Sequence, residues 1–168
     1  YSKEKLQALA KIAVEHNIAV ISDEIYEKLI YDDFTHHSFA SLSDEAKAIT
    51  ITINGVSKAF SMTGWRMGYA AGPAEVIAKI QALQSQQTSS ITSFVQQACI
   101  VALNEGQHEV EKMRKTFEQR RNLMHKLLNE IPKLHCAKPE GAFYLFPDVS
   151  AYLQKTAPKL FIDDSNDL

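Results

Sequence analysis

Four polar side chains with complementary chemistry follow two short apolar stretches of the sequence. Asp23 and Tyr26 come just after the first stretch, Lys58 comes after the second, and Arg66 follows eight residues later between two glycines. In open α/β sheets, ligands bind beyond the carboxyl ends of the strands. If both stretches are strands of one sheet, an acid, a phenol, a lysine and an arginine converge at one edge. Their spacing alone does not identify the ligand.

The elements that must position these side chains alternate between strand and helix. The wholly apolar run 18–21 is typical of a strand that a parallel sheet buries on both faces. Predicted strands cover residues 18–21, 49–53, 68–72 and 142–146, and predicted helices cover residues 3–17, 44–48, 74–87, 92–104 and 107–131, the first with Ser2 as its N-cap. This alternation predicts an α/β fold with a mostly parallel sheet and flanking helices. The long last helix followed by a turn and a strand indicates the start of a smaller α+β domain.

Composition excludes several classes of function. The 168 residues are 45% hydrophobic and 23% charged, which is typical of a globular protein, and the net charge of -2 gives no support for a nucleic-acid or anionic-membrane partner. No apolar run approaches the roughly 18 residues that a membrane span needs. Cys99 and Cys136 lie too far apart in sequence for a metal-binding pair, so we expect two buried thiols in a reducing compartment.

Some tempting residues have simpler interpretations. His36 and His37 are adjacent on a polar loop without a third ligand at useful spacing, so we expect them to be solvated and predict no metal site. The basic residues of the long helix alternate with glutamates, which favours a solvated face over nucleic-acid binding. These basic residues are Lys112, Arg114, Lys115, Arg120, Arg121 and Lys126. The aromatic side chains of the last predicted strand are interpreted as core.

A specific motif surrounds the lysine. The sequence GVSKAFSMTGWRMG, residues 55–68, resembles the pyridoxal-phosphate (PLP) attachment signature of class I aminotransferases. The segment SDEIY at residues 22–26 is similar to an upstream segment of that family, and GAFY at residues 141–144 is similar to a strand of its small domain. The resemblance extends from Tyr1 to about Tyr152, and it implies the fold of PLP-dependent transferases.

The resemblance also implies a role for each residue of the edge. Lys58 would form an imine with the cofactor aldehyde and carry a proton during catalysis. Asp23 would keep the pyridine nitrogen protonated, and Tyr26 would donate a hydrogen bond to the 3-oxygen of the ring. Arg66 would bind the cofactor phosphate, with assistance from Ser57.

The implied protein is a cytoplasmic, homodimeric aminotransferase that exchanges an amino group between an amino acid and a 2-oxo acid. Similarity around residues 59–66 favours an aspartate-like donor. Residues 1–105 would be the C-terminal part of the large cofactor-binding domain, and residues 106–168 the bridging helix and the start of the small domain. Other family parts would lie outside this sequence, so we expect the chain alone to be inactive. A PLP-dependent β-lyase or synthase of the same fold, or a non-catalytic fragment, remains an alternative.

Overall fold

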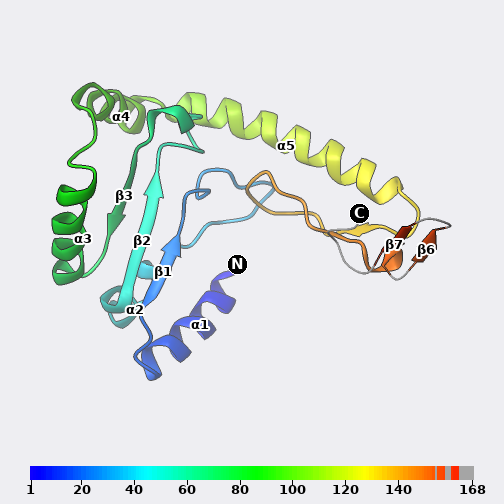
Figure 1. Cartoon of the computed structure of the whole chain (residues 1–168), viewed down its shortest axis with the longest axis horizontal. Helices are drawn as coiled ribbons and strands as arrows, with labels where there is room; N and C mark the ends of the chain where they lie inside the picture. Colours follow the sequence, from blue (N-terminus) through cyan, green and yellow to red (C-terminus); the bar gives the residue numbers. More distant parts are fainter. Residues whose placement is uncertain (154, 158–159, 163–168) are drawn as a thin grey trace.

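A three-stranded sheet forms the centre of the computed structural model, which describes residues 1–153, 155–157 and 160–162. Its strands, in spatial order, are β1 (Val20–Asp23), β2 (Thr50–Gly55) and β3 (Gly68–Ala71) (Figure 1). β1 and β2 are parallel, whereas β3 runs antiparallel to β2. The predicted α/β class is confirmed, with helices and strands alternating along the first half of the chain.

Two capped helices pack beside β1. α1 (Lys3–Glu15) begins at Ser2, whose hydroxyl accepts a hydrogen bond from the backbone, as predicted. α2 (Asp44–Ile49) begins in the same way at Ser43 and leads directly into β2. Between them lies the short 3-10 helix η1 (Phe39–Ser41). These elements share a small core made of Ala10, Phe39 and Ala46, against which Leu6, Val20 and Leu42 pack.

Three helices follow the sheet. α3 (Ala74–Gln87) comes after β3, and α4 (Ser93–Glu105) packs over the end of β2. Val56, Val95 and Cys99 form the second core cluster. α5 (Gln107–Glu130) has 24 residues, so it carries the chain roughly 36 Å away from the sheet (Figure 1). No helix of the described residues has the length and apolar character required to cross a membrane.

The segment beyond α5 forms short strand pairs. β4 (His135–Cys136) pairs with β5 (Pro147–Asp148), and β6 (Lys155–Ala157) pairs with β7 (Leu160–Ile162). The 3-10 helix η3 (Ser150–Tyr152) lies between the two pairs along the chain. Cys99 and Cys136 are both buried free thiols, as predicted, while the reducing compartment stays a prediction.

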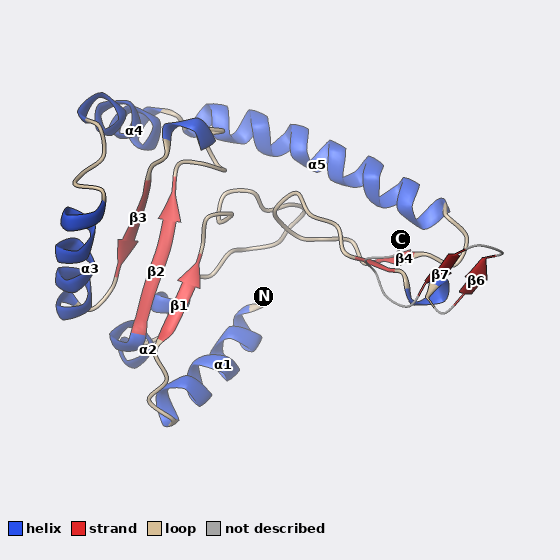
Figure 2. Cartoon of the chain, viewed as in Figure 1, coloured by secondary structure: helices blue, strands red, loops and turns tan. Residues whose placement is uncertain are grey.

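The strand predicted at residues 142–146 is wrong. Gly141 makes one isolated antiparallel bridge to Ile30, and Ala142 then adopts a φ of 57°, which ends extended pairing at once. Figure 2 shows this segment as a loop that meets the loop following β1. The aromatic pattern therefore reflects contact with that loop instead of a place in a sheet.

Candidate cofactor site

The acid and the lysine leave the sheet at the same edge. Asp23 is the last residue of β1 and lies opposite Ile53 of β2, and the amide of Glu24 still donates to the carbonyl of Ile53 at 2.9 Å. Lys58 follows the last residue of β2, Gly55, by three positions. Because the two strands are parallel, both side chains start from their carboxyl ends, where α/β sheets bind ligands.

A tight turn presents Lys58 and Ser57. Val56 is fully buried and Ala59 is buried beside it, so the turn is anchored by its apolar residues while Ser57 and Lys58 are only half-buried. Gly55 allows the close approach of β3, because a Cβ there would lie 2.9 Å from the Cα of Gly68.

Aromatic rings surround the amine of Lys58. Its Nζ lies 5.9 Å from the centre of the Tyr26 ring and 5.7 Å from the centre of the Phe143 ring. Contacts of this kind stabilise an ammonium group through the ring quadrupole. Tyr26 and Phe143 also meet edge to face, with centroids 5.3 Å apart. Two segments that are distant in sequence therefore enclose one side of the predicted cofactor lysine.

The hydroxyl of Tyr26 lies 2.7 Å from the hydroxyl of Tyr144. Burial raises the pKa of Tyr26 well above its ordinary value, and the negative charge of Asp23 raises it further. Tyr26 therefore remains a neutral phenol at physiological pH, with a hydrogen to donate. The interpretation of the late aromatic residues as core is wrong, because Phe143 is 37% exposed and Tyr144 is 60% exposed.

Arg66 lies at the far end of the loop that begins with the Lys58 turn. The loop is closed where Gly55 pairs with Gly68. Arg66 has a left-handed backbone (φ 53°, ψ 47°), an uncommon conformation for a residue other than glycine. Its guanidinium donates to the carbonyl of Thr63 at 2.9 Å and borders a hollow of ≈ 760 Å³. Within the described part of the chain, no hydrogen bond or ion pair connects Arg66 to Asp23, Tyr26 or Lys58.

A buried carboxylate fixes the end of β1. Glu24 is only 6% exposed, and its Oε1 accepts hydrogen bonds from Ser22 Oγ at 2.9 Å, Ser38 Oγ at 2.9 Å and Phe39 N at 3.1 Å. Such a carboxylate ties the loop before η1 to the residue next to Asp23. Sequence reasoning missed this role, because two of the three partners, Ser38 and Phe39, lie 14 and 15 residues further along the chain.

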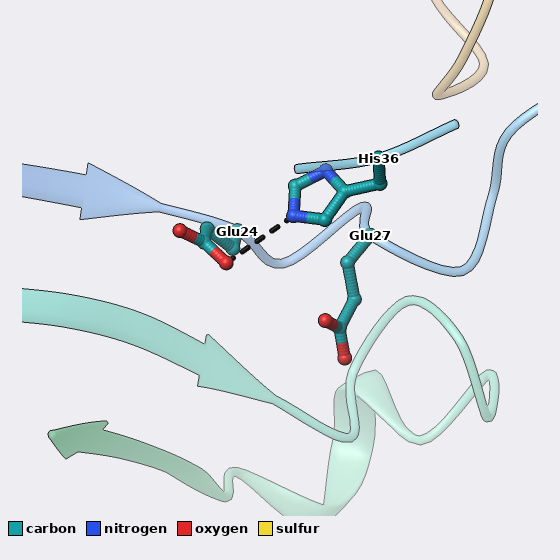
Figure 3. A group of neighbouring side chains, drawn as sticks. All are labelled: Glu24, Glu27 and His36. Atoms are coloured by element: carbon teal, nitrogen blue, oxygen red, sulfur yellow. Dashed lines mark hydrogen bonds and ion pairs between the residues drawn. The ribbon is translucent and has the colours of Figure 1, made fainter. Parts of the chain in front are cut away.

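His36 completes this contact, and the prediction that it is simply solvated is wrong. Its Nε2 lies 3.2 Å from Glu24 Oε2, and its side chain is 29% exposed (Figure 3). The ligand atoms of Glu24, Glu27 and His36 lie within 4.8 Å of one another, which is a donor set that a divalent cation could use. Since Glu24 already binds four protein donors, we interpret the group as a structural anchor.

The aromatic residues reach Lys58 because two loops cross beside it; we call residues 29–32 and 139–142 the crossing. The amide of Tyr31 donates to the carbonyl of Glu140 at 2.9 Å, and the amide of Ala142 donates to the carbonyl of Leu29 at 2.8 Å. The hydroxyl of Tyr31 also donates to the carbonyl of Ala142. Leu29 and Tyr31 are fully buried, so the crossing is a packed contact.

Arg121 of α5 holds the crossing together. Its Nη1 donates to the carbonyl of Pro139 at 2.6 Å, and its guanidinium pairs with both carboxylate oxygens of Asp32 at 3.0 and 3.2 Å. The guanidinium also lies 4.8 Å from the centre of the Tyr31 ring. The prediction of a solvated face is therefore wrong for Arg121, which is 2% exposed. Other charges of α5 do form surface pairs along the helix, such as Lys112 with Glu109.

Comparisons with known proteins agree with this architecture. The model of the family described as aminotransferase class I and II matches residues 1–163. The chain is 53% identical over 156 residues to an aspartate aminotransferase of Bacillus sp. (strain YM-2), covering 93% of this chain and 40% of the relative. It is 45% identical over 154 residues to an asparagine–oxo-acid transaminase of Streptococcus mutans, covering 92% of this chain and 39% of the relative.

A solved structure is similar throughout. The crystal structure of an aspartate aminotransferase from Rhizobium meliloti superposes with a TM-score of 0.93 at 40% identity, covering 99% of this chain and 42% of that one. The chain spans about 40% of the length of the curated relatives it matches. The roles of Asp23, Tyr26, Ser57, Lys58 and Arg66 stay predictions.

Proposed function

The chain belongs to the family of class I and II aminotransferases, as the resemblance predicted, and from this premise we propose that it forms the cofactor-binding part of a longer PLP-dependent enzyme. The enzyme would move an amino group between an amino acid and a 2-oxo acid. The observation that carries the proposal is the position of the Lys58 amine, 5.9 Å from the centre of the Tyr26 ring, at the sheet edge where Asp23 ends β1. This cofactor is bound through a lysine and an acidic or basic partner for its ring nitrogen, and Lys58 and Asp23 provide these two groups.

The residues at this edge fit the cofactor chemically. Bound there, PLP would supply an aldehyde that accepts an amino group and a ring that withdraws electrons. Lys58 would hold the cofactor through its amine and then carry a proton to and from the substrate. Asp23 is exposed at the strand end, where its charge would keep the ring nitrogen protonated. Tyr26, with its raised pKa, would donate a hydrogen bond to the 3-oxygen of the ring.

The phosphate end is assigned to the loop between β2 and β3. Arg66 is exposed and only its Nη1 donates to a carbonyl, that of Thr63, which leaves other N–H donors for phosphate oxygens. Ser57 precedes Lys58 in the same turn and would assist.

Aspartate is the amino donor that we propose. The names of similar proteins support this choice, because the Bacillus and Rhizobium relatives are both aspartate aminotransferases. The Streptococcus relative, named for asparagine, defines the nearest alternative donor. Aspartate and asparagine differ by one negative charge on the side chain. Comparing the transamination rates of the full-length protein with the two donors therefore distinguishes them.

The domain division is also a proposal. Residues 1–105 would belong to the large cofactor-binding domain, and residues 106–168 would form the bridging helix and the start of the small domain. Large apolar side chains are exposed, such as Ile21 at 72%, Phe94 at 67% and Phe146 at 94%. Such exposure supports contact with further protein surface, which a homodimer would supply. The full-length protein is also proposed to be cytoplasmic, and this chain alone to be inactive.

The test begins with the attachment site. The full-length protein is incubated with PLP, reduced with borohydride and digested, and the modified peptide is identified by mass spectrometry. We expect the label on Lys58, its loss in Lys58→Ala, and its retention in the control Lys79→Ala, which changes an exposed lysine of α3. A label on another lysine, or no label on the unaltered protein, contradicts the proposal and favours a non-catalytic role.

A second measurement separates reaction types. Incubation with aspartate should convert the bound cofactor to its amino form and release the 2-oxo acid in equal amount. A second substrate, an amino acid with a thiol leaving group on Cβ, tests the alternatives. Loss of the thiol with release of ammonia and a 2-oxo acid would assign the site to a β-lyase, and replacement of the thiol at Cβ by an added nucleophile would assign it to a synthase.

A further inference from the structure

Tyr144 reaches the site from the segment that follows α5 in the chain. It lies 118 residues after Tyr26 in sequence, yet their hydroxyl oxygens are 2.7 Å apart and their ring centres 5.7 Å apart. Tyr144 also packs on Phe143, with ring centres 4.9 Å apart, and Phe143 stacks on Phe117 of α5 at 5.5 Å. The aromatic contacts and the crossing together fix where the Tyr144 hydroxyl lies.

Counting hydrogens sets the direction of this hydrogen bond. A phenol carries one hydrogen to donate and has two lone pairs to accept. If Tyr26 donates its hydrogen to the cofactor, as the proposed function requires, it has none left for Tyr144. The hydrogen between the two hydroxyls must then come from Tyr144.

We infer that Tyr144 is a positioning residue, which donates its hydrogen to Tyr26 and so aims and strengthens the hydrogen bond from Tyr26 to the 3-oxygen of the cofactor. This inference rests on the proposed function. Hydrogen bonds in a chain polarise one another, so a phenol that accepts one becomes a better donor. Tyr144 would act only through Tyr26.

The consequence appears in the acidity of the linkage between Lys58 and the cofactor. While the linkage is protonated, its proton would partly neutralise the negative charge on the neighbouring 3-oxygen of the ring. After the linkage loses this proton, the 3-oxygen would carry its full negative charge. A donor to this oxygen stabilises the deprotonated form and lowers the pKa of the linkage. Removing the Tyr144 hydroxyl should therefore weaken the donor and raise that pKa.

The experiment is an absorbance titration of the cofactor bound to the full-length protein. Tyr26→Phe should raise the pH midpoint by about 1–2 units, since it removes a hydrogen bond to a charged oxygen. Tyr144→Phe should raise it by about 0.3 unit, the fraction expected from cooperative strengthening. Tyr69→Phe, which removes the hydroxyl of an exposed tyrosine of β3, is the matched control and should leave the midpoint unchanged.

The double variant decides between indirect and direct action. In a Tyr26→Phe background, Tyr144→Phe should cause no further shift, because its path to the cofactor is gone. A cofactor-free readout accompanies this: in tyrosine-labelled protein, the NMR signal of the Tyr26 phenol carbon should move in Tyr144→Phe and stay in Tyr69→Phe. Tyr144→Met provides a second variant without a hydroxyl should the first disturb folding.

The outcomes separate the two proposals. No absorbance band in the unaltered protein contradicts the proposed function, and this inference with it. A band whose midpoint moves in Tyr26→Phe but not in either Tyr144 variant contradicts only the inference. An equal shift with and without the Tyr26 hydroxyl also overturns it, because Tyr144 would then act independently of Tyr26.

Discussion

Replacing Arg121 by methionine should open the crossing while leaving the rest of α5 intact. Methionine keeps the length and much of the apolar stem, so packing along the helix is retained. The change removes the donor to the Pro139 carbonyl and the ion pair with Asp32. Asp32 keeps Lys138 at 3.1 Å and remains in contact with water, so no unpaired buried charge is left behind.

The size of the effect follows from the contacts of Arg121. A hydrogen bond from a charged donor contributes about 1.5–3 kcal/mol, and the contact with the Tyr31 ring adds about 0.5–2 kcal/mol. In the opposite direction, Arg121 Nε is buried without a hydrogen-bond partner among the described residues, a cost of about 1–3 kcal/mol that methionine relieves. The net loss is about 2 kcal/mol, which corresponds to roughly 30-fold faster local opening.

Amide hydrogen exchange of the full-length protein measures this opening directly. The amides of Tyr31 and Ala142, which bond across the crossing, should exchange about 30-fold faster in Arg121→Met. Amides in the middle of α5 should be unaffected. Arg120→Met is the matched control, because Arg120 is exposed and one residue away. Equal acceleration in both variants, or none in Arg121→Met, would refute the role assigned to Arg121.

Two further predictions concern stability. The hydrogen bonds from Arg121 hold the pKa of Asp32 below its ordinary value of 3.8, so the stabilisation of the crossing by this pair should be present above about pH 4 and lost as the pH falls through the lowered pKa. In Asp32→Asn, the rate of amide exchange at the crossing should no longer increase as the pH falls below about 4, after correction for the intrinsic exchange rate. The same pH dependence in Asp32→Asn and in the unaltered protein would contradict the assignment. Gly106→Ala should lower the free energy of unfolding by about 1–3 kcal/mol, and with it the urea midpoint. The reason is steric, because the new Cβ would lie 2.5 Å from the Ala102 carbonyl oxygen. Gly64→Ala, with nothing within 4 Å, should be close to neutral, and equal effects of the two would reject the steric explanation.

Local signals predicted the strand that leads to Lys58 at residues 49–53, close to the observed β2 (Thr50–Gly55). α3 has the predicted bounds, because Pro73 can precede a helix but cannot continue one. β1 starts two residues later than predicted, at Val20. Asn17 adopts a φ of 50° and the amide of Ile18 still bonds to the carbonyl of Ala13, so these residues end α1 before the strand can begin.

Long-range contacts were beyond the reach of pattern reasoning. In the sequence, Arg121 cannot be distinguished from the other basic residues of α5. Its buried position depends on a pairing with Asp32, which lies 89 residues earlier. The placement of Tyr144 has the same cause, since its partner Tyr26 lies 118 residues away. In both cases the side chain type was visible, but the facing residue was set by how α5 brings distant loops together. The motif GAFY gave the one available signal that the region has a function.

The crossing can form only late in the synthesis of the chain, because its two halves are far apart in sequence. Tyr31 leaves the ribosome 111 residues before Ala142, the residue whose carbonyl its hydroxyl binds. At about 5–20 residues per second, this interval lasts roughly 5–20 s. For most of this interval the lysine turn has been translated but lacks the ring of Phe143, so newly made chains are incomplete at this place until the segment after α5 is made.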